Sequence, residues 1–404
     1  MTLLRTPARL WLVPALLLVA AGCGRRQPRA LVPTIVGTSP RDTVVVMGEP
    51  RVIETLPVVE AGRFDTGKMW TFENPPLDYF AEAYGFRPSD EWLTRVRLAA
   101  LRLPNCTASF VSPDGLVLTN HHCGRESATA VSREGEDLIT NGFFAATRQE
   151  ERRVPELYVD QLVEIHDVTS QVQAALDPAR SEEQQIEARD STVEHIQQRM
   201  SQSRGLTCQV TSLYFGGKYS SYCYRRYDDV RLVFIPELAI GYFGGDPDNF
   251  TYPRYVLDVS FFRVYGPDGE PLRTDTFLNW SESGPRAGEP VFVVGNPGST
   301  SRLNTVAQLE YRRDVQEPFT VRLLESRVKI LREYMAERPE KRAALINDYF
   351  SLTNALKAYR GQLAGLRDPV LMARKAAFER RFREAVARDT ALQRRYGRLW
   401  DEIA

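Results

Sequence analysis

The chain has 404 residues, of which 43% are apolar and 26% charged, and its 52 Lys and Arg residues balance its 52 Asp and Glu residues. This length and apolar content predict two or three domains with hydrophobic cores. A net charge of zero excludes a protein that binds nucleic acid through an overall basic field, so we expect no nucleic-acid partner.

The first 23 residues predict an export signal. Two arginines precede an apolar run, Leu10 to Gly22, that is too short for a permanent membrane-spanning helix. The small residues directly before Cys23 resemble a bacterial lipobox, although Ala20 stands where leucine is usual. We expect a lipid on Cys23 that anchors the protein to a membrane of the bacterial cell envelope, facing the periplasm or the cell surface. The alternative is an ordinary secretory signal. Residues 24–60 then predict a tether.

Four cysteines remain after Cys23, and an even number in an exported protein predicts disulfides. Three pairings are possible. Their local spacing favours Cys106–Cys123 and Cys208–Cys223. Each bond would close a short loop, which stabilises a protein by about 3 kcal/mol.

Strands dominate the first part of the chain after one short helix. Ser89 and Asp90 form a capping signal that predicts a helix from Glu91 to Leu101. Next, "CTASFVS", the turn "PDG" and "LVLTN" predict a hairpin. A polar helix is predicted in "ARSEEQQIEARDSTVEHIQQRMSQ". Further strands are predicted in "ERRVPELYVDQLVEIHDVT", "TCQVTSLYFGGKYSSYCYRRYDDVRLVFIP", "LDVSFFRVYGPDG" and "EPVFVVGNPG".

Helical patterns fill the chain from Thr305 onward, in "VRLLESRVKILREYMAE", "LINDYFSLTNALKAYRGQLAGL" and the last 33 or so residues. The sequence therefore predicts an α+β fold in three parts. Residues 61–275 form a first strand-rich unit with a helical insert near 178–203, residues 276–304 begin a second one, and residues 305–404 form a helical domain. This domain reaches "WDEIA" without a stop signal, so we expect it to be incomplete.

The stretch "NCTASFVSPDGLVLTNHHCG" carries the chemistry of the first unit. Adjacent histidines on a strand point to opposite faces and cannot easily share an ion, so we expect no metal. A nucleophilic hydrolase fits better, and a serine peptidase would need no cofactor. In two-barrel serine proteases, a histidine precedes a cysteine whose disulfide returns to the preceding hairpin. His122 has that position and is the candidate general base, whereas His121 should point into the core. The alternative is a structural histidine beside a disulfide.

A histidine base needs a carboxylate that orients it and a serine that it activates. Asp258 in "LDVSFFRVY" and Asp229 in "DDVRLVF" both precede alternating apolar residues, and the residues alone leave both open. Ser299 in "VVGNPGST" is disfavoured as the nucleophile, because Pro297 occupies a position where an oxyanion hole would need an N–H group. No serine of the chain is therefore assigned.

Five ordered motifs resemble the bacterial dipeptidyl-peptidase seven and eleven family, from about Gly67 to the end: "GKMWTFENPP", "CTASFVSPDGLVLTNHHCG", "GGDPDNFTYPRY" followed by Asp258, "VVGNPGSTSR" and "SLTNALKAYRGQL". The resemblance implies a chymotrypsin-like (trypsin-like) double β-barrel, here with an incomplete second barrel, plus a mostly helical domain. It also implies a serine-type dipeptidyl aminopeptidase, which releases dipeptides from peptide substrates with a free amino terminus, and a possible homodimer.

Carried over by position, the resemblance implies that His122 is the base and Asp258, rather than Asp229, its partner. Asn249, Phe250 and Asn354 match the residues that hold the substrate's amino terminus, with Phe250 in place of the usual tryptophan. An ammonium group needs such oxygen acceptors in a closed end.

The family's serine lies beyond residue 404, so we expect this chain alone to be inactive. The alternative function is a catalytically inactive peptide-binding envelope lipoprotein. A trypsin-type endopeptidase is disfavoured, because the helical domain would obstruct an open cleft.

Overall fold

The computed structural model describes residues 45–47, 53–55, 59–62, 65, 67–177, 181–297 and 301–404. The predicted signal segment, Cys23, most of the predicted tether and Ser299 lie outside the described residues. Among the residues that are described, no helix combines the length and the apolar character needed to cross a membrane. The chain divides into two units, Met1–Val59 and Glu60–Ala404. In the first unit β1 (Val45–Met47) pairs with β2 (Ile53–Thr55) in antiparallel orientation.

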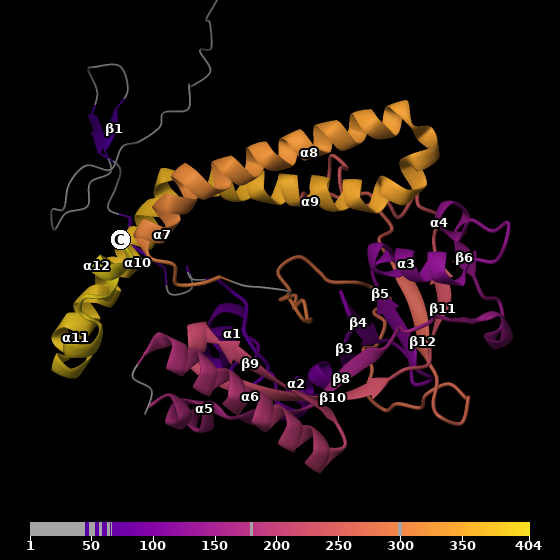
Figure 1. Ribbon diagram of the computed structural model, residues 1–404, viewed down its shortest axis with the longest axis horizontal. Helices are drawn as coiled ribbons and strands as arrows, with labels where there is room; N and C mark the ends of the chain where they lie inside the picture. Colours follow the sequence, from indigo (N-terminus) through magenta and orange to yellow (C-terminus); the bar gives the residue numbers. More distant parts are fainter. Residues whose placement is uncertain are drawn as a thin grey trace, which may run out of the picture. The chain divides into compact units, whose positions relative to one another are not determined.

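The second unit is built on a ten-stranded antiparallel sheet (Figure 1). The strands are β3 (Ala100–Arg102), β4 (Thr107–Phe110), β5 (Leu116–Thr119), β6 (Phe143–Phe144), β7 (Arg152–Arg153), β8 (Val159–Asp167), β9 (Thr207–Leu213), β10 (Lys218–Tyr227), β11 (Val230–Ile235) and β12 (Ser260–Val264). Their order is β6-β11-β12-β5-β4-β3-β8-β10-β9, with β7 beside β11. The predicted β4–β5 hairpin is confirmed by the pairing of Ser109 with Leu118.

The core lies on one face of the central strands. Side chains of β4, β5 and β12 alternate between buried and partly exposed positions. Phe110, Val117 and Phe262 are fully buried and belong to the same apolar cluster. Burying each such side chain contributes about 1.5–3 kcal/mol, so this cluster fixes the end of β5 and the start of β12.

Helices join and cover the strands. They are α1 (Leu77–Tyr84), α2 (Asp90–Ala99), α3 (His121–Val131), α4 (Leu138–Asn141), the 3-10 turn η1 (Arg148–Glu150), α5 (Thr169–Leu176), α6 (Glu182–Arg204) and the 3-10 turn η2 (Tyr214–Gly216). The prediction of α2 is confirmed, and the Ser89 hydroxyl accepts a hydrogen bond from the Trp92 backbone N–H. The predicted polar insert is confirmed as α6. Its buried Ile196 and Met200 pack in one cluster with Val172 of α5.

The helix α3 was not predicted, and the expectation that His121 and His122 lie on a strand is wrong. Asn120 is the N-cap residue with extended backbone angles, and both histidines stand in the first turn of α3. The Asn120 side chain makes no capping hydrogen bond and instead donates to Asp258. The helix is stabilised by packing, because Ala128 is fully buried in the apolar cluster of the sheet. The two rings still diverge, because neighbours on a helix point about 100° apart.

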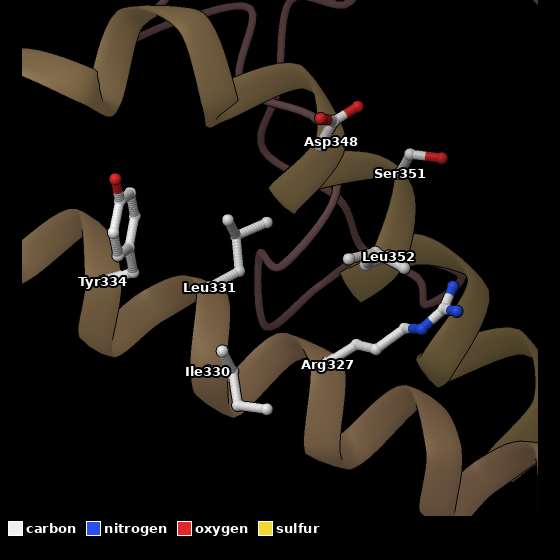
Figure 2. A pocket seen from close by; sticks show the side chains of 7 residues that line it. All are labelled: Arg327, Ile330, Leu331, Tyr334, Asp348, Ser351 and Leu352. Atoms are coloured by element: carbon white, nitrogen blue, oxygen red, sulfur yellow. The ribbon is translucent and has the colours of Figure 1, made fainter.

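The rest of the chain is helical. It comprises α7 (Val306–Tyr311), the π-helical turn η3 (Arg312–Gln316), α8 (Glu317–Glu337), the 3-10 turn η4 (Pro339–Lys341), α9 (Arg342–Leu366), α10 (Pro369–Arg388), α11 (Thr390–Tyr396) and α12 (Leu399–Ile403). Helices α8 and α9 lie side by side (Figure 1) and share a cluster of Val321, Leu356 and Leu363. A hollow of about 490 Å³ opens between them, and Leu331 and Tyr334 of α8 reach toward it (Figure 2). It contains none of the predicted site residues.

Two predicted elements differ from the structure. Residues 289–297 form no strand, and Val293 is 99% exposed. A strand needs a backbone partner for its N–H and C=O groups, and an apolar run alone does not supply one. The last helix is also interrupted, because the Asp389 carboxylate accepts hydrogen bonds from the backbone of Ala391 and Leu392 and begins α11. The fold is α+β, with a sheet that forms a partial barrel and a helical region. The domain boundaries stay a prediction.

Candidate active site

The pairing of β5 with β12 brings the predicted base and carboxylate together. Ser260 of β12 lies opposite Thr119 of β5, so the residues that follow β5 meet those that precede β12. The Ser260 hydroxyl also donates a hydrogen bond of 2.8 Å to the carbonyl of Asn120. His122 and Asp258 therefore become neighbours although 136 positions separate them in the chain.

The carboxylate of Asp258 is the centre of a small hydrogen-bond network. His122 Nδ1 lies 2.8 Å from Oδ2 and 3.0 Å from Oδ1, and the His122 backbone N–H donates to Oδ1 at 3.0 Å. The side-chain amide of Asn120 donates to Oδ2 at 3.2 Å. The Asp258 side chain is 12% exposed and the His122 side chain 28%, so the carboxylate is screened while the ring keeps an open edge.

The electrostatics of the pair define its protonation. Burial acts to raise the pKa of Asp258, but the hydrogen bonds from His122 and the charge of its ring outweigh burial and hold the pKa below its usual range. Asp258 is thus ionised at neutral pH and can only accept, so His122 Nδ1 carries the proton. No described residue hydrogen bonds His122 Nε2, which leaves its lone pair available. This is the tautomer that a general base needs.

His121 points the other way, into the core, as predicted. Its ring is fully buried, and Nε2 lies 3.0 Å from the carbonyl of Pro236, to which it donates. A Cβ atom at Gly241 would lie 2.5 Å from this ring, so the chain passes there only as glycine. Burial lowers the pKa of His121 and keeps the ring neutral.

Both disulfides expected from spacing are present. Cys106–Cys123 ties the segment after β3 to the first turn of α3, and we call it the β3–α3 disulfide. Cys208–Cys223 joins two directly paired positions of β9 and β10, and we call it the β9–β10 disulfide. Cys106, His122 and Cys123 lie close enough together for a metal ion. The two sulfur atoms are bonded to each other, however, and only thiolates bind metals well.

The predicted amino-terminus residues come from two distant segments. The side-chain amide of Asn249, in the loop between β11 and β12, donates to Asn354 Oδ1 of α9 at 2.9 Å. Asn249 is fully buried, and its own Oδ1 has no hydrogen-bond partner. A buried oxygen without a donor is an acceptor that an ammonium group can use.

Phe250 does not share this burial. Its backbone has φ of +58°, in the left-handed region, and the residue is 61% exposed. The structure therefore directs the side chains of Asn249 and Phe250 to different surroundings. Asp229 makes no hydrogen bond to His122. Both of its carboxylate oxygens accept from Arg231 instead, at 2.9–3.0 Å.

Sequence reasoning missed two residues that touch the pair. Asn120 could have been found from its place directly before the histidines, where a capping residue is common. Phe243 could not. Its ring stacks on the imidazole of His122 with the ring centres 4.1 Å apart and the planes at 19°.

The fold and the histidine–aspartate pair are those of a serine peptidase. Comparison with known proteins shows to which peptidase family the chain belongs. Residues 64–404 match the family described as Peptidase S46. The chain therefore belongs to the peptidase S46 family.

Curated relatives carry peptidase names. Dipeptidyl-peptidase 7 of Capnocytophaga gingivalis is 29% identical over 69% of this chain, and an Asp/Glu-specific dipeptidyl-peptidase of Shewanella putrefaciens is 31% identical over 70%. This chain covers 40% of the length of each. The crystal structure of Porphyromonas endodontalis DPP11 in complex with the dipeptide Arg-Glu superposes with a TM-score of 0.66 at 22% identity. It matches 84% of this chain and 50% of that one, which shows a shared fold.

Proposed function

We propose that this chain carries the histidine–aspartate half of a serine-type dipeptidyl aminopeptidase, an enzyme that releases dipeptides from the free amino terminus of peptides. The observation that carries the proposal is the His122–Asp258 contact of 2.8 Å with Nε2 left unpartnered, in a chain of the peptidase S46 family. Asp258 holds the imidazole in one tautomer. His122 Nε2 then takes the proton of the attacking hydroxyl and returns it to the leaving amine.

The nucleophile of this reaction comes from outside the described residues, because no described serine hydrogen bonds His122. Attack would form an acyl bond between the serine oxygen and the peptide carbonyl, and the amine that leaves would take the proton from His122. Asp258 would stabilise the imidazolium between these two steps. We therefore expect the described residues alone to give no turnover.

The limit to dipeptides rests on the amide pair Asn249 and Asn354. Asn249 Oδ1 is buried and lacks a donor. We propose that the ammonium group of the substrate donates to it, which would fix the distance from the amino end to the bond that is cut. The alternative function, an inactive peptide-binding lipoprotein, uses the same amide pair without chemistry.

Calorimetric titration tests the binding half of the proposal. A tetrapeptide with a free amino terminus should bind saturably, and its acetylated form should bind about 10- to 100-fold more weakly, as expected for a lost hydrogen bond to a charged group. Asn249→Ala should remove this difference. Asn141→Ala, at an exposed amide of α4 that bonds only its own helix, is the matched control and should keep it. Equal binding of the free and acetylated peptides would contradict an exopeptidase.

Release of a fluorophore from a dipeptide amide tests the chemical half. In the protein that contains the family's serine, turnover should disappear in Asp258→Asn and persist in Asp229→Asn, because Asp258 hydrogen bonds His122 whereas Asp229 hydrogen bonds Arg231. Selective binding without turnover by the protein that contains the family's serine would favour the inactive binding protein.

We further propose that the protein is exported and lipid-anchored in the cell envelope through Cys23. The support is the apolar run that ends in small residues before this cysteine. Cys23→Ser should move the protein from the membrane fraction to the soluble fraction of the envelope, and an unchanged distribution would contradict the anchor. A homodimer is proposed from the family resemblance, and light scattering that gives one chain's mass would exclude it.

A further inference from the structure

Phe243 covers one face of the His122 imidazole. The ring centres lie 4.1 Å apart and the planes meet at 19°, which is a stacked pair. Asp258 meanwhile holds the Nδ1 edge of the same ring at 2.8 Å. The imidazole is thus restrained at one edge and on one face, while the Nε2 edge stays free. Such a restraint opposes rotation of the ring about its Cβ–Cγ bond.

Phe243 is itself held by groups other than His122. The neighbouring Tyr242 packs edge-on against Phe350 of α9, with ring centres 4.6 Å apart. On the other side Gly244 has φ of +90°, and a Cβ atom there would lie 2.4 Å from the carbonyl oxygen of Phe350. Only glycine lets the loop approach α9 this closely. The residues on both sides of Phe243 therefore contact one residue of α9, Tyr242 through its ring and Gly244 through its backbone.

A single carboxylate completes this support. Asp246 Oδ1 accepts the Gly244 N–H at 2.7 Å, and Oδ2 accepts from Arg254 at 3.0 Å. The Arg254 guanidinium carbon in turn lies 5.0 Å from the centre of the Phe243 ring. Asp246 thereby ties the loop backbone to a cation that packs on the same phenyl ring.

We propose that Phe243 is a positioning residue for His122, and that the contact of Gly244 with Phe350 makes the orientation of the imidazole depend on α9 being seated on the loop. The role of His122 as a base rests on the proposed function, whereas the restraint on its ring does not. Asn354 stands one helical turn after Phe350 on α9. The site for the amino terminus and the support of the base therefore share one helix.

Nuclear magnetic resonance of the histidine rings tests this inference. The chain has four histidines, so their signals can be assigned one by one by substitution. In the wild type, the ring current of Phe243 should shift the carbon-bound ring protons of His122 upfield. In Phe243→Leu these signals should move downfield, and the Nδ1–H proton should exchange with water roughly three- to tenfold faster, as expected for a lost aromatic contact. The signals of His166 and His195 should stay in place.

A second variant tests the dependence on α9. Gly244→Ala places a methyl group against the Phe350 carbonyl and should also move the His122 signals, although it leaves both stacked rings intact. Phe144→Leu, at an exposed ring of β6, is the matched control and should move none of them. An unchanged Nδ1–H exchange rate in Phe243→Leu would overturn the positioning role, and unchanged His122 signals in Gly244→Ala would overturn the dependence on α9. If Phe243→Leu does not fold, the His122 signals of Gly244→Ala test the inference alone: shifted signals support it and unchanged signals contradict it.

These measurements need no turnover, so they separate this inference from the proposed function. If the protein hydrolyses no peptide but the two variants change the His122 ring as expected, the restraint is supported and only the peptidase proposal is contradicted. If the protein hydrolyses peptides but the variants leave the His122 ring unchanged, the peptidase proposal is supported and the restraint is contradicted. In a hydrolysing protein, Phe243→Leu should lower kcat by up to about 100-fold with little change in KM, because a misplaced base affects chemistry more than binding.

Discussion

Replacing Asp258 by asparagine keeps the shape of the side chain but exchanges one acceptor oxygen for an NH2 donor. The carboxylate accepts hydrogen bonds from the His122 backbone N–H, from His122 Nδ1 and from the Asn120 amide. An amide oxygen can keep the backbone bond at Oδ1, and its NH2 group then faces two donors. The imidazole can relieve this conflict by moving its proton from Nδ1 to Nε2. We therefore expect Asp258→Asn to reverse the tautomer of His122.

The same substitution should lower the free energy of unfolding by about 1.5–3 kcal/mol at neutral pH, the contribution of a hydrogen bond to a charged group. The sign of the pH dependence follows from the pKa of Asp258, which the folded state holds below its usual range. A depressed carboxyl pKa stabilises the fold above the unfolded value of about 3.9, and this stabilisation is lost as the pH falls through the folded value. The gap between wild type and Asp258→Asn should close in acid.

Nitrogen-15 spectra of the imidazole give the tautomer, and urea unfolding at neutral and acid pH gives the stability. Asp229→Asn is the matched control. The hydrogen bond from Arg231 also lowers the pKa of Asp229, so this variant should lose stability with the same pH sign while His122 keeps its Nδ1 proton. The reasoning is refuted if His122 keeps Nδ1–H in Asp258→Asn, or if the wild type already carries the proton on Nε2.

Three further predictions concern the stability of the fold. Replacing both cysteines of either disulfide by serine should cost about 3 kcal/mol of stability in urea, but only loss of the β3–α3 disulfide should disturb the ring signals of His122. Arg312→Met should cost about 3–5 kcal/mol in the same assay, because it leaves the fully buried Glu317 carboxylate without its partner at 2.6 Å, and adding Glu317→Gln should recover most of the loss. Gly241→Ala should cost about 1–3 kcal/mol and shift the His121 signals, because the new methyl group would lie 2.5 Å from that ring; unchanged stability would contradict the contact.

Elements with local signals could be predicted from the sequence. The Ser89 cap predicts α2, the "PDG" turn predicts the β4–β5 hairpin, and both form as expected. Residues 289–297 contain an apolar run, but a strand depends on a partner elsewhere in the fold, and none of the described strands pairs with them. The start of α3 was missed for a related reason. Asn120 stands at the N-cap position without a side-chain capping hydrogen bond, so the helix depends on packing of Ala128 against the sheet, which no local signal reveals.

The candidate site could likewise be predicted only in part from the sequence. The order of histidine and cysteine indicated His122. The residues alone left Asp258 and Asp229 open, the family resemblance implied Asp258, and the pairing of β5 with β12 gives the structural reason. Sequence spacing was enough to predict the disulfides, because each joins cysteines that are only 17 or 15 positions apart in the chain. Phe243 had no signal at all. Phe243 lies over His122 because of the path of its loop, and that path depends on the close approach of Gly244 to α9.

The loop between β11 and β12 joins the two halves of the proposed site. Its first part carries Phe243, which restrains the base, and six residues later it carries Asn249, which meets Asn354 on α9. Each half also depends on the same helix, because Phe350 supports the loop beside Phe243. On the proposed function, a peptide that draws Asn249 and Asn354 together would hold α9 against the loop and keep the imidazole aligned with Asp258. A peptide with a blocked amino terminus would lose affinity and this alignment together, so the preference for a free amino end should appear in kcat as well as in KM.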